Sequence, residues 1–315
     1  MNQASFLSLA HHKKLRCESF LDEMDKAIPW SEYINLLEPR YRKAGKVGRG
    51  KKELELMLKI YFLQQWYNLS DPAVEEAIYD RISFQKFLGI DLMGQEVPDE
   101  TTILNFRHFL ELHGLTKKLF DKTRDILEDR GYILKKGTIV DATIISAPSS
   151  TKNQTGKRDE EMRSTKKHGQ WYFGMKAHAG VDADSGVVHT LETGSANEHD
   201  KKRLAELLHG EERAIFGDKG YYDDNLKRGA RKAGIFWGVL DKGRRSRPLS
   251  LSQEKRNSKM SSIRAKVEHP FRILKCQWKF VKVKYRGLYK NTCQMFSLFM
   301  LANIYMLRRE LAATA

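Results

Sequence analysis

Three acidic residues stand where their carboxylates could do chemistry together. Asp141 lies in the middle of Gly137–Ile145, a run of β-branched and apolar residues that predicts a strand. A carboxylate inside a core strand is costly unless it is paired, hydrogen-bonded or bound to a cation. Asp218 ends a second short apolar run, and Glu268 follows in a helical segment. All three contexts allow the acids to meet at one edge of a sheet.

Three carboxylates gathered at one edge would repel one another and raise one another's pKa values. Two Mg²⁺ or Mn²⁺ ions, about 3.5–4 Å apart, would relieve that repulsion and serve phosphoryl transfer. One ion would deprotonate the attacking water or 3′-hydroxyl, while the other would stabilise the leaving oxygen. We therefore predict that Asp141, Asp218 and Glu268 are both the catalytic residues and the ligands of two divalent ions.

Two basic side chains accompany the third acid. Arg264 lies four residues before Glu268 and shares its helix face, and Lys275 lies seven residues beyond it. Pro270 should kink or divide the helix between them, because proline lacks a backbone donor. A surface ion pair worth about 0–1 kcal/mol would explain Arg264 and Glu268 as well, so the spacing alone does not assign them.

The charge of the chain points to a polyanionic partner. The 315 residues carry a formal net charge of +16. Residues 241–290 hold sixteen Lys and Arg against three acids, a net +13 of that total, with aromatic residues interleaved. We predict that this stretch binds the phosphates of nucleic acid. The predicted DNA contacts are Arg264, Lys275, Lys219, Arg272, Lys279, Lys282, Lys284 and Arg286.

Membrane insertion and secretion are not expected. No run reaches the roughly 18 apolar residues that a spanning helix needs. Acidic residues at 22, 23 and 25 interrupt any apolar core of a signal peptide.

Thiolate and zinc chemistry are disfavoured. The three cysteines are widely spaced and form no CxxC motif, which predicts buried free thiols in a reducing cytoplasm. None of the ten histidines forms an HExxH motif or a similar ligand set. We expect His178, His199 and His269 to form hydrogen bonds or to face DNA.

The pattern before Gly137 is helical. Residues 1–46 are weakly patterned, with short helices possible at Ser19–Ala27 and Trp30–Leu37 and a basic turn at Gly45–Gly50. Residues 47–132 predict a helical domain that binds DNA ends or dimerises. Exposed Arg107 and His108 could place a helix in a DNA groove, but a solvated scaffold fits equally well. The predicted helices are Lys51–Asn68, Asp71–Tyr79 with Asp71 as N-cap, Glu100–His113 and Thr116–Arg130.

Residues 133–315 predict a catalytic α/β domain, because strands and helices alternate. The long polar loop Ala147–Gln170 should be mobile or functional. Asp182 and Asp184 favour a hairpin turn over metal ligation. Asn197 or Asp200 should cap an amphipathic helix that runs through Leu208. The predicted strands are Thr138–Ser146, Trp171–Val181, Val187–Thr193, Ala214–Asp218 and Ile235–Leu240, followed by helices at Tyr221–Ala233 and near Lys259, and by Thr292–Leu311, an apolar helix that packs on the sheet.

An ordered set of motifs runs through the chain. These are Val140-Asp141-Ala142-Thr143, Phe173-Gly174-Met175-Lys176-Ala177-His178, Ala196-Asn197-Glu198-His199-Asp200, Gly217-Asp218-Lys219-Gly220-Tyr221 and Arg264-x3-Glu268-x6-Lys275. Together they resemble the DDE transposases of bacterial insertion sequences, specifically the IS-five group. Residues 51–113 are similar to the N-terminal helical region of that group.

The resemblance implies an RNase H-like core, a mixed sheet flanked by helices, behind a helical N-terminal domain. It implies a Mg²⁺-dependent enzyme that cuts the terminal inverted repeats and joins their 3′-hydroxyls to target DNA, acting as a homodimer or larger synaptic complex in a bacterial cytoplasm, at the nucleoid. Related groups have a tyrosine where this chain has Ser261. Only 49 residues separate Asp218 from Glu268, which leaves little room for a large inserted domain.

Two other functions fit parts of the pattern. A metal-dependent nuclease would use the same acids without strand transfer. A regulatory DNA-binding protein that had lost catalysis should lack an acid, whereas all three are present.

Overall fold

The structure is a computed structural model that describes residues 13–41, 52–152, 156–167, 169–243 and 248–313. The predicted turn at Gly45–Gly50 lies outside these residues. The chain divides into two compact units. Unit 1 comprises residues 1–64, 69–105 and 307–315, and unit 2 comprises residues 65–68 and 106–306.

Unit 1 is helical, as the sequence pattern predicts. α4 is apolar on nearly every side and is buried by its neighbours, with Phe62 stacked on Trp30 and edge-on to Tyr33. The N-cap of α5 is Ser70, which accepts a hydrogen bond from the Ala73 amide, and not Asp71 as predicted. One short helix, α6, was not predicted. The helices that lie wholly or partly in unit 1 are α2 (Arg16–Ala27), α3 (Trp30–Tyr41), α4 (Leu54–Tyr67), α5 (Asp71–Asp80), α6 (Ile82–Leu88), α7 (Glu100–Leu112) and α13 (Arg308–Ala313).

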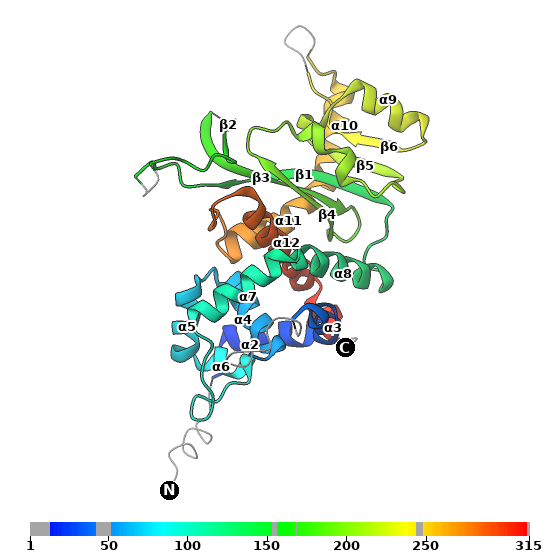
Figure 1. The fold of residues 1–315 in the computed structure, drawn as a ribbon. Helices are drawn as coiled ribbons and strands as arrows, with labels where there is room; N and C mark the ends of the chain where they lie inside the picture. Colours follow the sequence, from blue (N-terminus) through cyan, green and yellow to red (C-terminus); the bar gives the residue numbers. More distant parts are fainter. Residues whose placement is uncertain (1–12, 42–51, 153–155, 168, 244–247, 314–315) are drawn as a thin grey trace. The chain divides into compact units, whose positions relative to one another are not determined.

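Unit 2 is built on a six-stranded sheet, shown in Figure 1. Its strands are β1 (Gly137–Ser146), β2 (Arg163–Lys167), β3 (Gln170–Asp182), β4 (Val188–Ser195), β5 (Ala214–Gly217) and β6 (Phe236–Val239). β1 lies between β3, its antiparallel neighbour, and β5, its parallel neighbour. β5 pairs parallel with β6, and β3 pairs antiparallel with β4 and, through its first residues, with β2. The central strand is therefore the one that carries Asp141.

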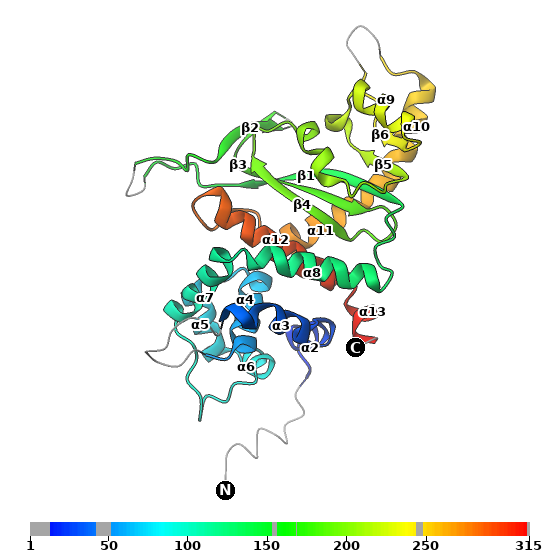
Figure 2. The same ribbon diagram turned by 45° about the vertical axis from the view of Figure 1, so that its right-hand side comes forward.

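Both faces of the sheet are covered. On one face α12 (Leu288–Met306) packs on β4, and α8 (Leu115–Asp129) packs on α12, as Figures 1 and 2 show. Asn303 of α12 donates to the Val188 carbonyl and accepts from the Val188 amide, which ties the helix to the strand. On the opposite face Val140 packs against Leu204, Leu207 and Tyr221. The predicted packing of the apolar C-terminal helix on the sheet is confirmed.

The segment that carries Glu268 is a broken helix. α10 (Leu251–Arg264) begins earlier than predicted and is followed by the 3₁₀ turn η4 (Ala265–Val267), α11 (Glu268–Arg272) and the π-helical turn η5 (Ile273–Gln277). The predicted division is present, and it lies just before Pro270. The reason is that a proline ring clashes with the carbonyl four residues earlier, which here is that of Lys266.

Two predictions about connecting segments need correction, and one is confirmed. The loop Ala147–Gln170 contains the strand β2. Only the short 3₁₀ turns η1 (Asp200–Arg203) and η2 (Ala205–Leu207) stand where an amphipathic helix was expected. Asp182 is a turn residue, because its carboxylate accepts hydrogen bonds from the backbone amides of residues 134, 135, 184 and 185. The helix α9 (Asp224–Lys232) then joins β5 to β6.

A glycine in β3 offers a test of this packing. A Cβ added to Gly174 would lie 2.1 Å from the Ile145 carbonyl oxygen, a backbone atom that cannot move aside. Gly174→Ala should therefore lower the free energy of unfolding by about 2–3 kcal/mol, measured by urea denaturation. In the control Gly229→Ala, in α9, the added Cβ would meet nothing within 4 Å among the described residues, so stability should stay level or rise by up to about 1 kcal/mol. Equal losses in the two variants would contradict the close approach of β3 and β1.

Candidate active site

Strand pairing brings the first two acids together. β1 and β5 run parallel with Val140 opposite Gly217, so Asp141 and Asp218 are the next residues on neighbouring strands, about 4.8 Å apart by strand spacing. A Cβ on Gly217 would lie 3.0 Å from the Val140 side chain, so glycine allows this approach. Asp218 caps the turn that follows, because its Oδ1 accepts a hydrogen bond of 2.7 Å from the Gly220 amide.

Arg264 joins the third acid to the first. Its Nη2 lies 3.0 Å from Oδ2 of Asp141 and 3.4 Å from Oε1 of Glu268. Two carboxylate oxygens from β1 and α11 therefore lie within 3.4 Å of a single nitrogen atom. The side chain of Asp141 is only 13% exposed, whereas that of Glu268 is 62% exposed. The structure thus brings the three predicted acids into one region, with a guanidinium between two of them.

The buried position of Asp141 changes its acidity. Burial raises the pKa of Asp141 from its ordinary value of 3.8 to about 6. Arg264 and the Ala142 amide oppose that rise, and the neighbouring Asp218 and Glu268 add to it. The site therefore carries more negative charge than Arg264 alone compensates.

Lys275 lies on the same side of the site but is partly used by the fold. Its Nζ donates a hydrogen bond of 2.9 Å to the Ile144 carbonyl. Burial lowers the pKa of Lys275, the nearby Lys167 lowers it further, and Glu268 opposes the change. Glu268, Lys275 and Lys167 are thus near neighbours, which extends the site from the acids toward β2.

The other predicted contacts differ in exposure. The segment after η5 is held against the end of β1, because the Val283 amide donates to the Ser146 carbonyl at 2.8 Å. Trp278 and Phe280 belong to the core, so these two interleaved aromatic residues do not face a ligand. Five of the predicted cations are exposed and Lys284 is half-buried. The exposed ones are Lys219, Arg272, Lys279, Lys282 and Arg286.

A polar cluster behind the acids was not predicted. Lys176 donates hydrogen bonds to Oδ1 of Asp200 at 2.9 Å and to the Glu198 carbonyl at 2.7 Å. A Cβ on Gly220 would lie 2.9 Å from Asp218 and 3.3 Å from Asp200, so the cluster adjoins the turn of the second acid. Asp200 therefore caps no helix, contrary to the prediction. The sequence held one indication of this cluster, because Lys176 and Asp200 both belong to the ordered motifs.

Two buried groups complete this cluster. His178 is fully buried and neither ring nitrogen has a hydrogen-bond partner among the described residues, so the prediction of a hydrogen-bonding or DNA-facing histidine is wrong there. Burial lowers the pKa of His178 to about 4, against the opposing effect of Asp200. Burial, with the help of Asp200, also raises the pKa of the Tyr221 hydroxyl. His199 and His269 are exposed.

Two further predictions are wrong. Arg107 is buried, pairs with Glu111 at 3.2 Å and stacks on Tyr285, whereas His108 is exposed as expected. All three cysteines are free, but only Cys293 is buried.

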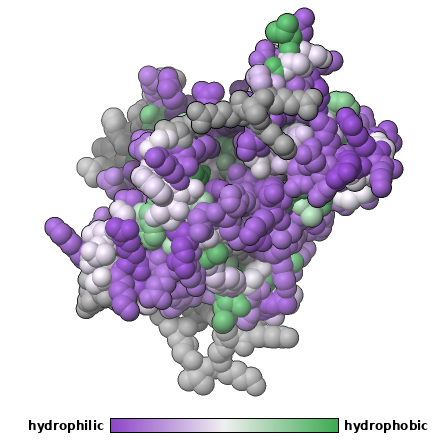
Figure 3. Space-filling model, turned by 90° about the horizontal axis from the view of Figure 1, so that it is seen from above, coloured by the Kyte–Doolittle hydropathy of each residue, from purple (hydrophilic) through white to green (hydrophobic). Residues whose placement is uncertain are grey.

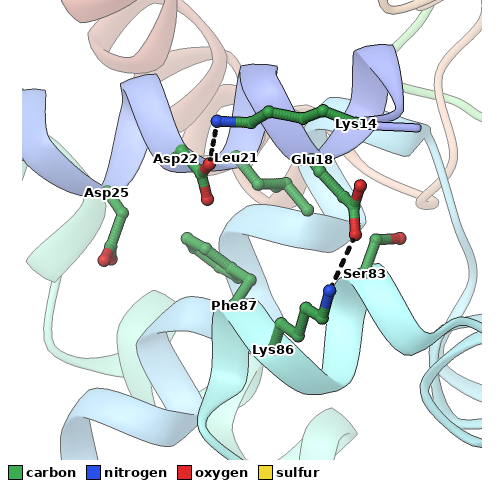
Figure 4. Close-up of a pocket in the computed structure, with 8 residues that line it drawn as sticks. All are labelled: Lys14, Glu18, Leu21, Asp22, Asp25, Ser83, Lys86 and Phe87. Carbon is green, nitrogen blue, oxygen red and sulfur yellow. Dashed lines mark hydrogen bonds and ion pairs between the residues drawn. The ribbon is translucent and has the colours of Figure 1, made fainter. Parts of the chain in front are cut away.

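A pocket of about 360 Å³ lies elsewhere, in unit 1 between α2 and α6 (Figure 4). Its charged side chains satisfy one another, because Lys14 pairs with Asp22 at 2.7 Å and Lys86 with Glu18 at 3.1 Å. None of the three acids lines it. We therefore place the candidate site beside the middle of β1 and the end of β5, where Asp141 and Asp218 lie.

Comparison with known proteins identifies the family. Residues 133–304, more than half of the chain, match the family described as "Transposase DDE domain". Residues 9–109 match the family described as "Transposase domain (DUF772)". The chain is a DDE transposase.

The family confirms the fold class and the enzymatic nature of the protein. The mixed sheet flanked by helices is the RNase H-like core that a transposase DDE domain implies. A cryo-EM structure of the piggyBac transposase synaptic complex with hairpin DNA is similar at 9% identity and a TM-score of 0.47, over 94% of this chain and 76% of that one. No helix in the described part of the transposase is both long and apolar enough to cross a membrane.

DDE transposases generally use divalent metal ions. As the side chains stand, no three His, Cys, Asp or Glu residues in the described part of the chain are arranged to hold a metal. The donors still fit such an ion in kind, because carboxylate oxygens are its preferred ligands. The guanidinium of Arg264 already places a positive charge between Asp141 and Glu268. The residues therefore suit a divalent ion in the kind of donor atom they offer.

The acidity of Asp141 can be tested in the metal-free transposase. Because folding raises the pKa of Asp141 to about 6, its contribution to stability is complete below about pH 4 and is lost as the pH rises through about 6. Asp141→Asn removes the buried charge, so at pH 8 the variant should be more stable than the native chain by on the order of 1–3 kcal/mol. Near pH 4 the two should be equal. Urea midpoints measured across this range check the prediction, and a less stable variant at pH 8 would contradict it.

Proposed function

We propose that this DDE transposase belongs to the IS-five group and that it cuts the ends of an insertion sequence and joins their 3′-hydroxyls to target DNA. The observation that carries the proposal is the meeting of Asp141, Asp218 and Glu268 around one position of the sheet edge. The ordered motif set supports the narrower group. The elements among the described residues between the last two acids are α9, β6, α10 and two 3₁₀ turns, η3 (Lys219–Tyr221) and η4, which agrees with the absence of a large inserted domain.

In this proposal Asp141, Asp218 and Glu268 hold the divalent ions, Mg²⁺ or Mn²⁺ and two in number. The ions, when bound, activate the attacking oxygen and stabilise the leaving oxygen of the phosphodiester. The contribution of the protein is to hold the three carboxylates in place. β1 and β5 hold two carboxylates on a rigid sheet, and α11 presents the third from outside. Arg264, which balances the acids here, is placed to bind a phosphate when the ions replace it.

The DNA partners are the terminal inverted repeats and a target duplex. Support comes from the net charge of +16 and from the exposed cations that follow Glu268. The face seen in Figure 3 is dominated by hydrophilic residues, with only scattered hydrophobic ones. We further propose that residues 47–132 bind DNA ends or dimerise, that the enzyme works as a homodimer or larger complex, and that it acts at the bacterial nucleoid.

The assignment of the acids is tested by a pre-cut DNA end with a free 3′-hydroxyl and a target plasmid. Asp141→Asn, Asp218→Asn and Glu268→Gln should each reduce joining by on the order of 10³-fold or more, because each removes a ligand of the ions, while binding of the end persists. The matched control Glu254→Gln changes an exposed acid of α10 and should leave joining unchanged. Full activity in any of the three variants would remove that residue from the site. Cutting without joining by the native enzyme would instead identify a nuclease.

The phosphate-binding cations are tested by the salt dependence of DNA binding. Lys279→Ala and Lys282→Ala each remove an exposed cation, so the slope of log K against log salt should become shallower by about 0.9 for each phosphate that is no longer neutralised. Lys117→Ala is a suitable control, because Lys117 is exposed on α8 and pairs with Asp121. Slopes that match the native value in both test variants would place the DNA on another surface.

A further inference from the structure

β2 and the start of β3 form a ribbon of two strands that extends past the core of the sheet. β2 pairs with β3 from Arg163 opposite Gly174 to Lys167 opposite Gln170. The pairing of β3 with β1 and β4 begins only at Gly174 and Met175. In Figures 1 and 2 this ribbon lies at the left end of the sheet. Two-stranded ribbons are marginally stable alone, so this one depends on the continuation of β3 into the sheet.

One face of the ribbon carries aromatic rings, each covered by a cation. Trp171 is 68% exposed, and the ammonium of Lys166, its cross-strand neighbour, lies 5.9 Å from the indole centroid. Phe173 stands two residues along the same face, with the guanidinium of Arg158 at 5.5 Å from its ring. An exposed indole beside cations suits a ligand that offers both flat apolar groups and negative charge.

The other face of the ribbon also carries positive charge. Lys167 lies on it and is close enough to Lys275 to lower the pKa of that lysine. The sequence has no acid between Met162 and Val181. Two of the three acids just before the ribbon, Asp159 and Glu161, accept hydrogen bonds from the amides of residues 287 and 288 at the start of α12. The third, Glu160, lies 4.0 Å from Lys157. Nothing in the ribbon itself neutralises its cations.

Strand register relates the ribbon to the acids. Asp141 pairs with Ala179, and alternation places Ala179, Phe173 and Trp171 on the same face of β3. Eight residues separate Ala179 from Trp171, which corresponds to about 26 Å along a strand. At 3.4 Å per base pair, this is roughly eight base pairs of duplex DNA. Lys275 stands between the two points, because it bonds the carbonyl of Ile144, which pairs with Lys176. Lys167 pairs with Gln170, just beyond Trp171.

We propose that the β2–β3 ribbon is a DNA-binding arm that grips the duplex of the element's own end, about eight base pairs from the bond that the acids attack. The inference rests on the proposed function. A two-stranded ribbon fits the major groove, where Lys166 and Lys167 reach phosphates and Trp171 lies against the apolar edges of the bases. Because the arm and the acids belong to one sheet, it fixes the register of the DNA relative to the cut.

Photo-crosslinking tests where the arm lies. A photoreactive amino acid replaces Trp171, and in a control protein it replaces Phe236, a half-exposed aromatic residue of β6. The probe is a duplex that carries the terminal repeat flanking the coding sequence, with target duplex added. The Trp171 position should crosslink to the end duplex roughly six to ten base pairs from the cut, and the Phe236 position should not. A crosslink to the target duplex only, or equal labelling from both positions, would overturn the proposal.

Binding measurements test whether the ribbon contributes to affinity. Trp171→Ala should weaken binding of the end duplex about fivefold, whereas Trp171→Phe should keep most of the affinity. Lys166→Ala should make the salt dependence shallower by about 0.9 in slope. Urea midpoints equal to the native value will show that both variants fold, since both side chains are exposed. If Trp171→Ala binds the end duplex with native affinity, the proposal that the ribbon binds DNA is refuted, while the transposase assignment stands. Failure of the native chain to bind the duplex would refute the proposed function, and the arm with it.

Discussion

The structure depends on compensating one buried negative charge. Asp141 occupies the central strand, where packing leaves its side chain 13% exposed and raises its pKa to about 6. An isolated carboxylate at such a position would be strongly destabilising. Arg264 supplies the compensating charge from a helix 123 residues away in sequence, and the same guanidinium reaches Glu268. A site that must hold a positive charge in the absence of ligand is well suited to exchange that charge for a metal ion.

The motifs that surround the acids are explained by close approach and by polar pairing. Gly174 and Gly217 allow β3 and β5 to approach β1 where a Cβ would touch a neighbour. Lys176 and Asp200 pair behind the turn that carries Asp218, on the face of the sheet opposite Asp141. Each of these residues belongs to one of the ordered motifs. A defect in any of them would act through the geometry of the site.

Charge is distributed unevenly around the site. Two cations that the sequence suggested as DNA contacts are used by the fold, as Lys275 bonds the Ile144 carbonyl and Arg264 pairs with Asp141. Net charge per segment therefore overstates the number of cations that face a ligand. The ribbon of β2 and β3 shows the reverse, because its few cations are exposed beside an aromatic ring and no acid lies within it. Its first strand, β2, lies in the stretch that the sequence pattern described as a long polar loop, mobile or functional.

The sequence by itself determined the helical or extended period of each segment and singled out three candidate acids. Strand β1, the long helices and the fold class could be predicted because side-chain periodicity and β-branched residues are local properties. The tertiary structure alone decided which charges meet. It showed that Arg264 lies between Asp141 and Glu268, that Arg107 is buried and that a strand interrupts the polar loop. These features arise from contacts between residues far apart in the chain. Local sequence patterns do not predict the free energy of such contacts.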